Sequence, residues 1–99
     1  MEIIRTEEGG VVTLKVSGRM DTNTAPEAEA AVARENMGGK LVFDFNELEY
    51  ISSAGLRVLL AAQKKANAAG GEMVVTGCQE AVLDVFDVTG FSDILTIEE

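Results

Sequence analysis

The chain is organised around one stretch of sequence, Tyr50-Ile51-Ser52-Ser53-Ala54-Gly55-Leu56-Arg57-Val58-Leu59-Leu60. Before it, residues 41–45 form an apolar run typical of a buried, parallel-type strand, and residues 46–49 suggest a polar turn. After it, apolar residues recur near helical spacing as far as Ala69, where two glycines end the pattern. We therefore expect Ser52 and Ser53 at the junction between a loop and a helix.

Two interpretations of this serine pair stay open from the residues alone. A serine before a helix commonly caps it, because the hydroxyl accepts a hydrogen bond from a free amide of the first turn. Ala54 and Gly55 carry no bulky side chain, however, and would leave the serine hydroxyls open to a partner. A phosphate added there would meet the positive end of the helix dipole. The local sequence suits a helix cap and also a phosphorylation switch.

The composition indicates one acidic domain. Ninety-nine residues are enough for one hydrophobic core, and 8 basic against 17 acidic residues give a net charge of −9. Nucleic acids and anionic membranes attract basic proteins, so we expect neither as a partner. A protein with a basic docking face is the expected class of partner.

The sequence lacks the residues that several common kinds of catalytic site require. The chain has no histidine and a single cysteine, Cys78, which excludes Ser-His and Cys-His pairs and leaves a zinc site without ligands. The three glycine doublets match no phosphate-binding loop. We therefore expect that the protein is not an enzyme and that it binds no cofactor and no metal. Cys78 is expected to be a half-buried residue after a strand, and with no signal peptide or membrane span visible we expect a cytoplasmic protein.

Strand and helix patterns alternate along the chain. A hairpin is expected from residues 3–4 and 11–17, with residues 18–23 as a loop. Thr24 and Glu27 match a capping box for a helix ending near Met37. A strand over 72–76, a helix over 79–88 and a strand over 94–97 complete the order β-β-α-β-α-β-α-β. This predicts an α/β fold with a mixed sheet of four to five strands and three or four helices.

The expected core comes from one face of each helix. Asp44, near the end of its strand, is expected to cap the turn that follows. The buried side of the first helix is thin. The residues expected to face inward are Ala28, Ala31, Val32, Leu59, Leu60, Val82, Val85 and Phe86.

Several segments in series resemble one known family. They are Tyr50 to Leu60, the strand ending in Asp44, Gly18-Arg19-Met20-Asp21, Gly71-Glu72-Met73-Val74-Val75 and Val85-Phe86-Asp87-Val88-Thr89-Gly90-Phe91. Together they resemble the STAS-domain anti-sigma factor antagonists of bacteria. The resemblance covers nearly the whole chain in order, and it implies a single STAS domain over residues 1–99.

The resemblance implies a partner switch. In that family the unphosphorylated antagonist binds an anti-sigma factor that is also a serine/threonine kinase, and so frees a sigma factor. The kinase phosphorylates one serine of the antagonist and releases it, and a phosphatase restores the first state. Carried over by position, the acceptor falls on Ser53, with Ser52 as second candidate. The family's glycine falls on Gly55, and Asp21 matches an aspartate in the loop beside the acceptor.

Two positions depart from the family pattern. Ser52 replaces an acidic residue and adds a second hydroxyl, and Arg57 stands where a glycine is common. Arg57 lies one helical turn beyond Ser53, so it either reaches a phosphate there or stays on a solvated face.

The expected contact surface also includes the outer face of the helix over residues 54–67. Its named residues are Asp21, Thr22, Asn23, Thr24, Ser52, Ser53, Ala54, Gly55 and Arg57. Ser52 keeps an alternative function open: a STAS scaffold without phosphorylation, or an accessory subunit of a transport or signalling complex.

Overall fold

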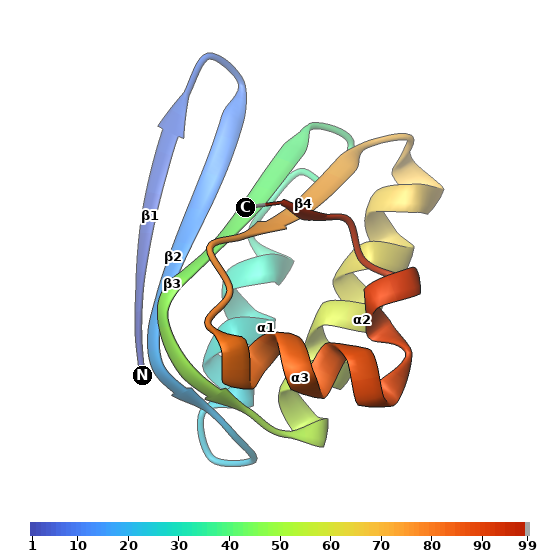
Figure 1. The fold of residues 1–99 in the computed structure, drawn as a ribbon. Helices are drawn as coiled ribbons and strands as arrows, with labels where there is room; N and C mark the ends of the chain where they lie inside the picture. The colour runs from blue at the N-terminus through green and yellow to red at the C-terminus, as the bar shows by residue number, and fades with distance from the viewer. Residues whose placement is uncertain (99) are drawn as a thin grey trace.

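A computed structural model describes residues 1–98 of the chain. It contains one five-stranded sheet and three α-helices, shown in Figure 1. The elements are β1 (Glu2–Glu8), β2 (Val11–Met20), α1 (Ala25–Ala33), β3 (Lys40–Ile51), α2 (Ser53–Ala69), β4 (Glu72–Thr76), α3 (Glu80–Thr89), the 3-10 helix η1 (Phe91–Asp93) and β5 (Ile97–Glu98). The predicted α/β class and element order are confirmed.

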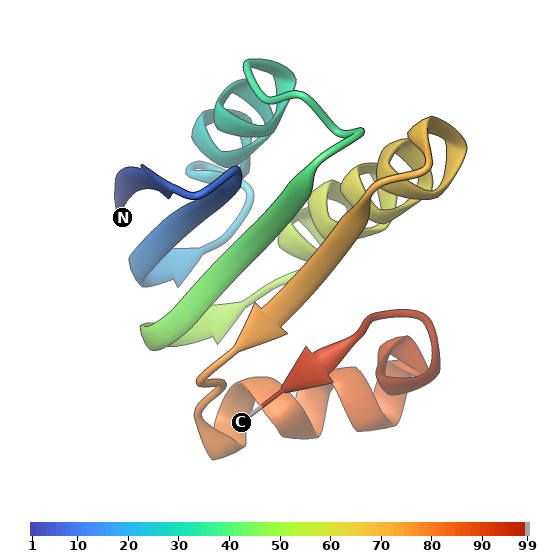
Figure 2. The same cartoon turned by 90° about the horizontal axis from the view of Figure 1, so that it is seen from above.

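The strands lie in the sheet in the order in which they occur in the sequence. β1 is antiparallel to β2, whereas the pairs β2–β3, β3–β4 and β4–β5 are parallel. Figure 2 shows β2, β3 and β4 side by side. Each crossover moves one strand further in the same direction, so right-handed connections put all three helices on one face of the sheet. That face carries the core.

The core lies between the helix-facing side of the sheet and the three helices. Along β3 the buried residues Leu41, Phe43 and Phe45 alternate with the half-buried Val42 and Asp44, as the period of two requires. The helices contribute the buried residues Ala28, Val32, Leu59, Ala62, Ala66, Val82 and Phe86. The expected inward positions are confirmed, except that Ala31, Leu60 and Val85 are only half-buried.

The polar turn predicted over residues 46–49 is wrong, because β3 continues through it to Ile51. β2 also runs further than predicted and ends at Met20, so residues 18–20 are strand instead of loop. The two extensions pair with each other, and Leu48 and Ile51 are buried there. The register shifts between Lys15 and Ser17 and again after Gly18, whose φ of +85° suits glycine. The irregular pairing bends the strands while keeping their apolar residues in the core.

The first helix is shorter than predicted and ends at Ala33 instead of Met37. Its C-terminal neighbours make other interactions. The Arg5 guanidinium donates two hydrogen bonds to the Glu35 carboxylate, at 2.8 and 3.1 Å, and the Glu35 side chain is 5% exposed. The Asn36 side chain accepts a hydrogen bond from the amide of Gly38. These contacts hold the chain in a turn and replace the last helical turn that the pattern predicted.

The end of the chain also differs from the prediction. Residues 94–97 were expected as a strand, but η1 ends at Asp93 and β5 begins only at Ile97. The apolar Leu95 in this segment is buried in the core without being part of a strand. Among residues 1–98 no helix combines the length and the apolar character needed to cross a bilayer.

Candidate functional site

Two loops meet at one edge of the sheet. β2 and β3 are parallel, so their carboxyl ends lie at the same edge, with Met20 and Ile51 as register partners. The amide of Ser52 donates to the carbonyl oxygen of Met20 at 2.9 Å. The loop that starts at Asp21 therefore lies beside the start of α2.

Asp21 organises its own loop. Its carboxylate accepts hydrogen bonds from the amides of Asn23 and Thr24 at 3.0 and 3.1 Å. Burial acts to raise the pKa of Asp21, but these amides, the Thr24 hydroxyl and the Arg19 charge outweigh it and lower the pKa below its ordinary value. The carboxylate is ionised at neutral pH and fixes the loop.

The prediction of a capping box from Thr24 and Glu27 is wrong. Thr24 stands at the N-cap position of α1 but makes no side-chain bond to the helix. Its hydroxyl accepts from the amide of Asp21 at 2.9 Å and donates to the carbonyl of Arg19 at 2.8 Å. Because the hydroxyl both accepts and donates hydrogen bonds to residues before the helix, Thr24 closes the loop instead of capping α1.

The two serines of the organising stretch differ in exposure. Ser52 occupies the N-cap position of α2, and its carbonyl accepts from the amide of Leu56 at 2.9 Å. Its hydroxyl oxygen makes no cap bond, is buried and has no hydrogen-bond partner within residues 1–98. Ser53 is the first residue of α2 and is exposed. Only Ser53 presents its side chain at the surface.

Gly55 lies behind this surface. It is buried, and a Cβ added there would lie 2.7 Å from Cγ1 of Ile51 and 3.0 Å from Cγ of Met20. The missing side chain lets the first turn of α2 pack onto the ends of β2 and β3. Gly55 therefore shapes the site from inside, whereas Ala54 is half-buried at its surface.

The α1–α2 groove, a hollow of about 420 Å³ between these helices, brings three of the predicted residues together. Thr22, Ala54 and Arg57 line it, from the loop and from the first turns of α2. Thr22 and Arg57 are exposed, and Arg57 has no ion-pair partner in the described part of the chain. Asn23 is exposed on the same loop.

Sequence reasoning missed Arg19 and Tyr50 as members of this site. They are register partners at the ends of β2 and β3, and the Arg19 guanidinium carbon lies 4.2 Å from the centre of the Tyr50 ring. Nε of Arg19 is 3.9 Å from Oδ2 of Asp21. Tyr50 is 39% exposed, so the pair faces solvent beside the loop. An aromatic residue close before the serines was the one available signal, because the strand register is not visible in the sequence.

The chemistry of the site is that of an accessible hydroxyl. Among residues 1–98 no group of three histidine, cysteine or acidic side chains is arranged to hold a metal ion. Cys78 is half-buried as expected, and burial raises its pKa to about 11, so its thiol is neutral at pH 7.

Asp44 accepts hydrogen bonds from the amide and side chain of Asn46. The prediction that Asp44 caps a turn is wrong, because residues 46–49 continue β3, and these bonds join neighbouring residues of that strand.

Comparison with known proteins agrees with this architecture. The chain matches the STAS domain over residues 2–99. It is 31% identical over 97 residues to the anti-sigma-B factor antagonist of Listeria monocytogenes, covering 96% of this chain and 85% of that protein.

Solved structures share the fold at lower identity. The crystal structure of tm1081 from Thermotoga maritima aligns with a TM-score of 0.91 at 21% identity, covering 98% of this chain and 86% of that one. The anti-sigma factor antagonist SpoIIAA of Bacillus aligns in its unphosphorylated form with a TM-score of 0.77 and in its phosphorylated form with 0.75, each at 14% identity. These alignments cover 99% of this chain and 88% and 92% of the SpoIIAA chains. The chain belongs to the STAS domain family.

Proposed function

We propose that this protein is an anti-sigma factor antagonist whose binding is controlled by phosphorylation of Ser53. The unphosphorylated form binds an anti-sigma factor with serine/threonine kinase activity and frees a sigma factor. Phosphorylation of Ser53 by that kinase releases the antagonist, and a phosphatase removes the phosphate. The protein then acts in the cytoplasm as a binding module, without catalysis of its own.

The observation that carries the proposal is the difference in exposure between the two serines. Ser53 is exposed at the first turn of α2, whereas the hydroxyl oxygen of Ser52 is buried. A kinase must reach the hydroxyl that it phosphorylates, which favours Ser53. A name and a structure support the same function: the Listeria relative is an anti-sigma-B factor antagonist, and SpoIIAA has been solved in a phosphorylated form.

The helix start suits a phosphate on Ser53. The first amides of α2 have no intrahelical acceptor, and the positive end of the helix dipole attracts an anion. Arg57 lies four residues further along α2, within reach of a charge-assisted hydrogen bond to that phosphate. The phosphate adds about −1.5 to −2 charge at pH 7. It would change the charge of the face that otherwise contacts the anti-sigma factor.

The test measures binding to the anti-sigma factor kinase of the same organism with and without ATP. The wild type should bind, and ATP should release it. Ser53→Ala should remain bound in the presence of ATP, since a methyl group fits the interface and accepts no phosphate. Ser53→Asp should bind more weakly, though less so than the phosphoprotein.

Ser52→Ala is the matched control and should still be released by ATP. Release of Ser53→Ala by ATP would contradict the proposal. Failure of the wild type both to bind and to be phosphorylated would favour the scaffold or accessory subunit, for which the serine at position 52 in place of the family aspartate is the supporting feature. The purified chain alone should not turn over ATP, for want of a phosphate loop or a general base.

A further inference from the structure

The α1–α2 groove has an apolar floor. Ala25, Val32, Val58 and Ala62 form it, each less than 10% exposed, and small side chains on both helices keep it open. Thr22 and Ala54 place one end of the groove beside Ser53. The groove is therefore continuous with the surface that the switch would control.

One rim of the groove is cationic. Arg57 and Lys65 stand on the α2 side, two turns apart, and both are exposed. Neither has an ion-pair partner within residues 1–98. The α1 rim carries the opposite charge on Glu29. Carboxylates of a bound segment would therefore face α2.

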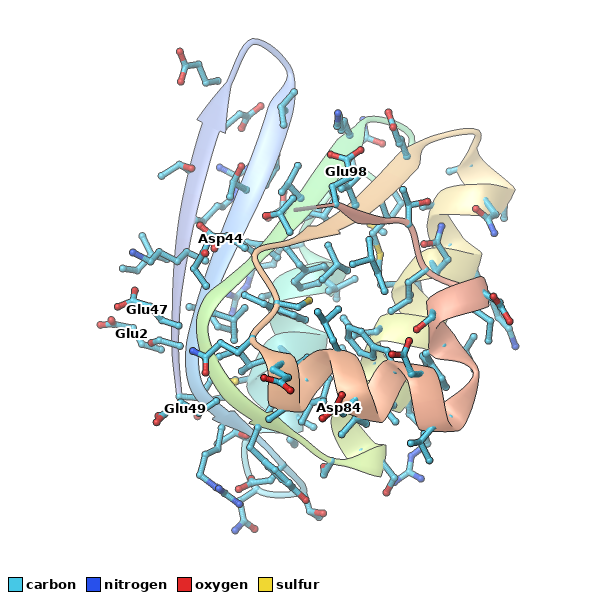
Figure 3. The ribbon with its side chains drawn as sticks, in the orientation of Figure 1. Glu2, Asp44, Glu47, Glu49, Asp84 and Glu98 are labelled. Carbon is cyan, nitrogen blue, oxygen red and sulfur yellow. The ribbon has the colours of Figure 1, made fainter. Side chains whose placement is uncertain are left out.

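The positive charge of this rim contrasts with the rest of the molecule. The net charge of the chain is −9, yet α2 has no acidic residue and three basic ones, Arg57, Lys64 and Lys65. In Figure 3 the labelled carboxylates belong to β1, β3, α3 and β5, and they are Glu2, Asp44, Glu47, Glu49, Asp84 and Glu98. An acidic segment would be repelled by those elements and attracted to the groove.

We propose that the α1–α2 groove binds an acidic amphipathic helix of the anti-sigma factor. Its apolar side chains enter the groove, and its carboxylates pair with Arg57 and Lys65. A groove with an apolar floor and a charged rim is the surface on which such a helix docks. The inference rests on the proposed function and adds the chemistry of the partner. The net charge of −9 alone led to the expectation of a basic docking face, but the rim of this groove is locally cationic, so the segment that enters it is acidic.

The same geometry connects the groove to the phosphate. Arg57 lines the groove and also lies one helical turn from Ser53. A phosphate on Ser53 would attract the Arg57 guanidinium and repel the partner's carboxylates. Phosphorylation would then help to release the partner, because the phosphate would bind Arg57 and leave only Lys65 to pair with the partner's carboxylates.

Neighbouring lysines provide a matched pair of variants. Lys65→Glu reverses a charge on the rim of the groove, whereas Lys64→Glu makes the same change on an exposed residue that does not line it. Binding of the anti-sigma factor should weaken about tenfold or more in Lys65→Glu and less than about threefold in Lys64→Glu. The difference should shrink in about 1 M salt, where charges are screened within about 3 Å. If both variants weaken binding equally while the wild type still binds, the groove is not the binding site for the acidic helix. The proposed function would not be affected by that result.

A second arm does not depend on the anti-sigma factor. The ¹⁵N-labelled full chain is titrated with a leucine/glutamate amphipathic peptide of about 18 residues, long enough to form a helix, and with its leucine/lysine counterpart. The acidic peptide should shift the amide signals of Ala54, Ala61 and Lys65 in the wild type and much less in Lys65→Glu. Shifts that are absent, or equal for the two peptides, would overturn the inference. So would groove signals that move with protein concentration alone, which would assign the groove to a second copy of this chain.

Discussion

The two helix starts at the edge of the sheet carry similar residues and use them differently. Thr24 precedes α1 after β2, and Ser53 begins α2 after β3. The Thr24 hydroxyl both accepts and donates hydrogen bonds within its loop. Ser53 is exposed at the first position of α2, and none of the hydrogen bonds described for these two loops uses its hydroxyl. A hydroxyl at a helix start is available for modification only where the preceding loop does not use it and where, unlike that of Ser52, it is not buried.

The two starts are also supported differently. The loop before α1 is held by the Asp21 carboxylate and the Thr24 hydroxyl. The start of α2 is held by close packing, with Gly55 against the strand ends and Leu59 completely buried one turn later. Side-chain hydrogen bonds fix the start of α1, whereas apolar packing and the backbone hydrogen bond from Ser52 to Met20 fix the start of α2.

Removing the apolar support of α2 should cost most. Leu59→Ala should lower the free energy of unfolding by about 2–5 kcal/mol, because Leu59 is fully buried and leaves a cavity. Leu60→Ala, next to it but only half-buried, is the control and should cost clearly less. Urea denaturation of both variants measures the difference. A Leu59→Ala protein as stable as Leu60→Ala would mean that another face of α2 packs on the sheet.

Removing the polar support of the other loop should cost less. Thr24→Val keeps the shape of the side chain but leaves the Asp21 amide and the Arg19 carbonyl without their partner. We expect a loss of roughly 1–2 kcal/mol in urea denaturation. Thr22→Val, on the exposed part of the same loop, should stay within about 0.5 kcal/mol of the wild type. A Thr24→Val protein of wild-type stability would remove Thr24 from the support of the loop.

The Asp21 carboxylate gives the loop a dependence on pH. Folding lowers its pKa, so its contribution to stability is present above the unfolded pKa, about 3.9, and is lost as the pH falls through the folded pKa. Carbon-detected NMR should show Asp21 titrating below the ordinary range of aspartate. In Thr24→Val its pKa should rise toward that range, because the Thr24 hydroxyl oxygen, which lies 3.2 Å from Oδ1 of Asp21 and shares its proton between that oxygen and the Arg19 carbonyl, is gone. A pKa at or above the ordinary value in the wild type would contradict the hydrogen-bonded loop.

Ser53→Ala should have the smallest effect on stability. Its hydroxyl is exposed and does not support the fold, so the free energy of unfolding should change by no more than about 0.5 kcal/mol. Thermal denaturation beside Thr24→Val gives the direct contrast between the two starts. A loss as large as that of Thr24→Val would show that Ser53 supports α2 and is less available than the comparison requires.

Much of the fold was predictable because its signals are local. The alternation of Leu41, Phe43 and Phe45 and the helical spacing through Leu59 identify their elements directly. The second half of β3 was not predictable in this way. Residues 46–49 look like a polar turn, and only pairing with the end of β2 makes them a strand and buries Leu48. Long-range pairing overrode the local preference.

The site shows the same division. The position of the serines before a helix could be read from the sequence, but their unequal exposure depends on how α2 packs on the strands. The apparent capping box failed because Thr24 had a better set of partners in its own loop. The Arg19–Tyr50 pair and the α1–α2 groove each join segments that only the folded chain brings together.

The position of the phosphate decides between the two serines. The chain is treated with its anti-sigma factor kinase and ATP, digested, and mapped by fragmentation mass spectrometry that separates Ser52 from Ser53. We expect phosphate on Ser53 in the wild type and in Ser52→Ala, and none in Ser53→Ala, because Ser53 is exposed whereas the Ser52 hydroxyl oxygen is buried. Phosphate on Ser52, or continued phosphorylation of Ser53→Ala, would contradict it.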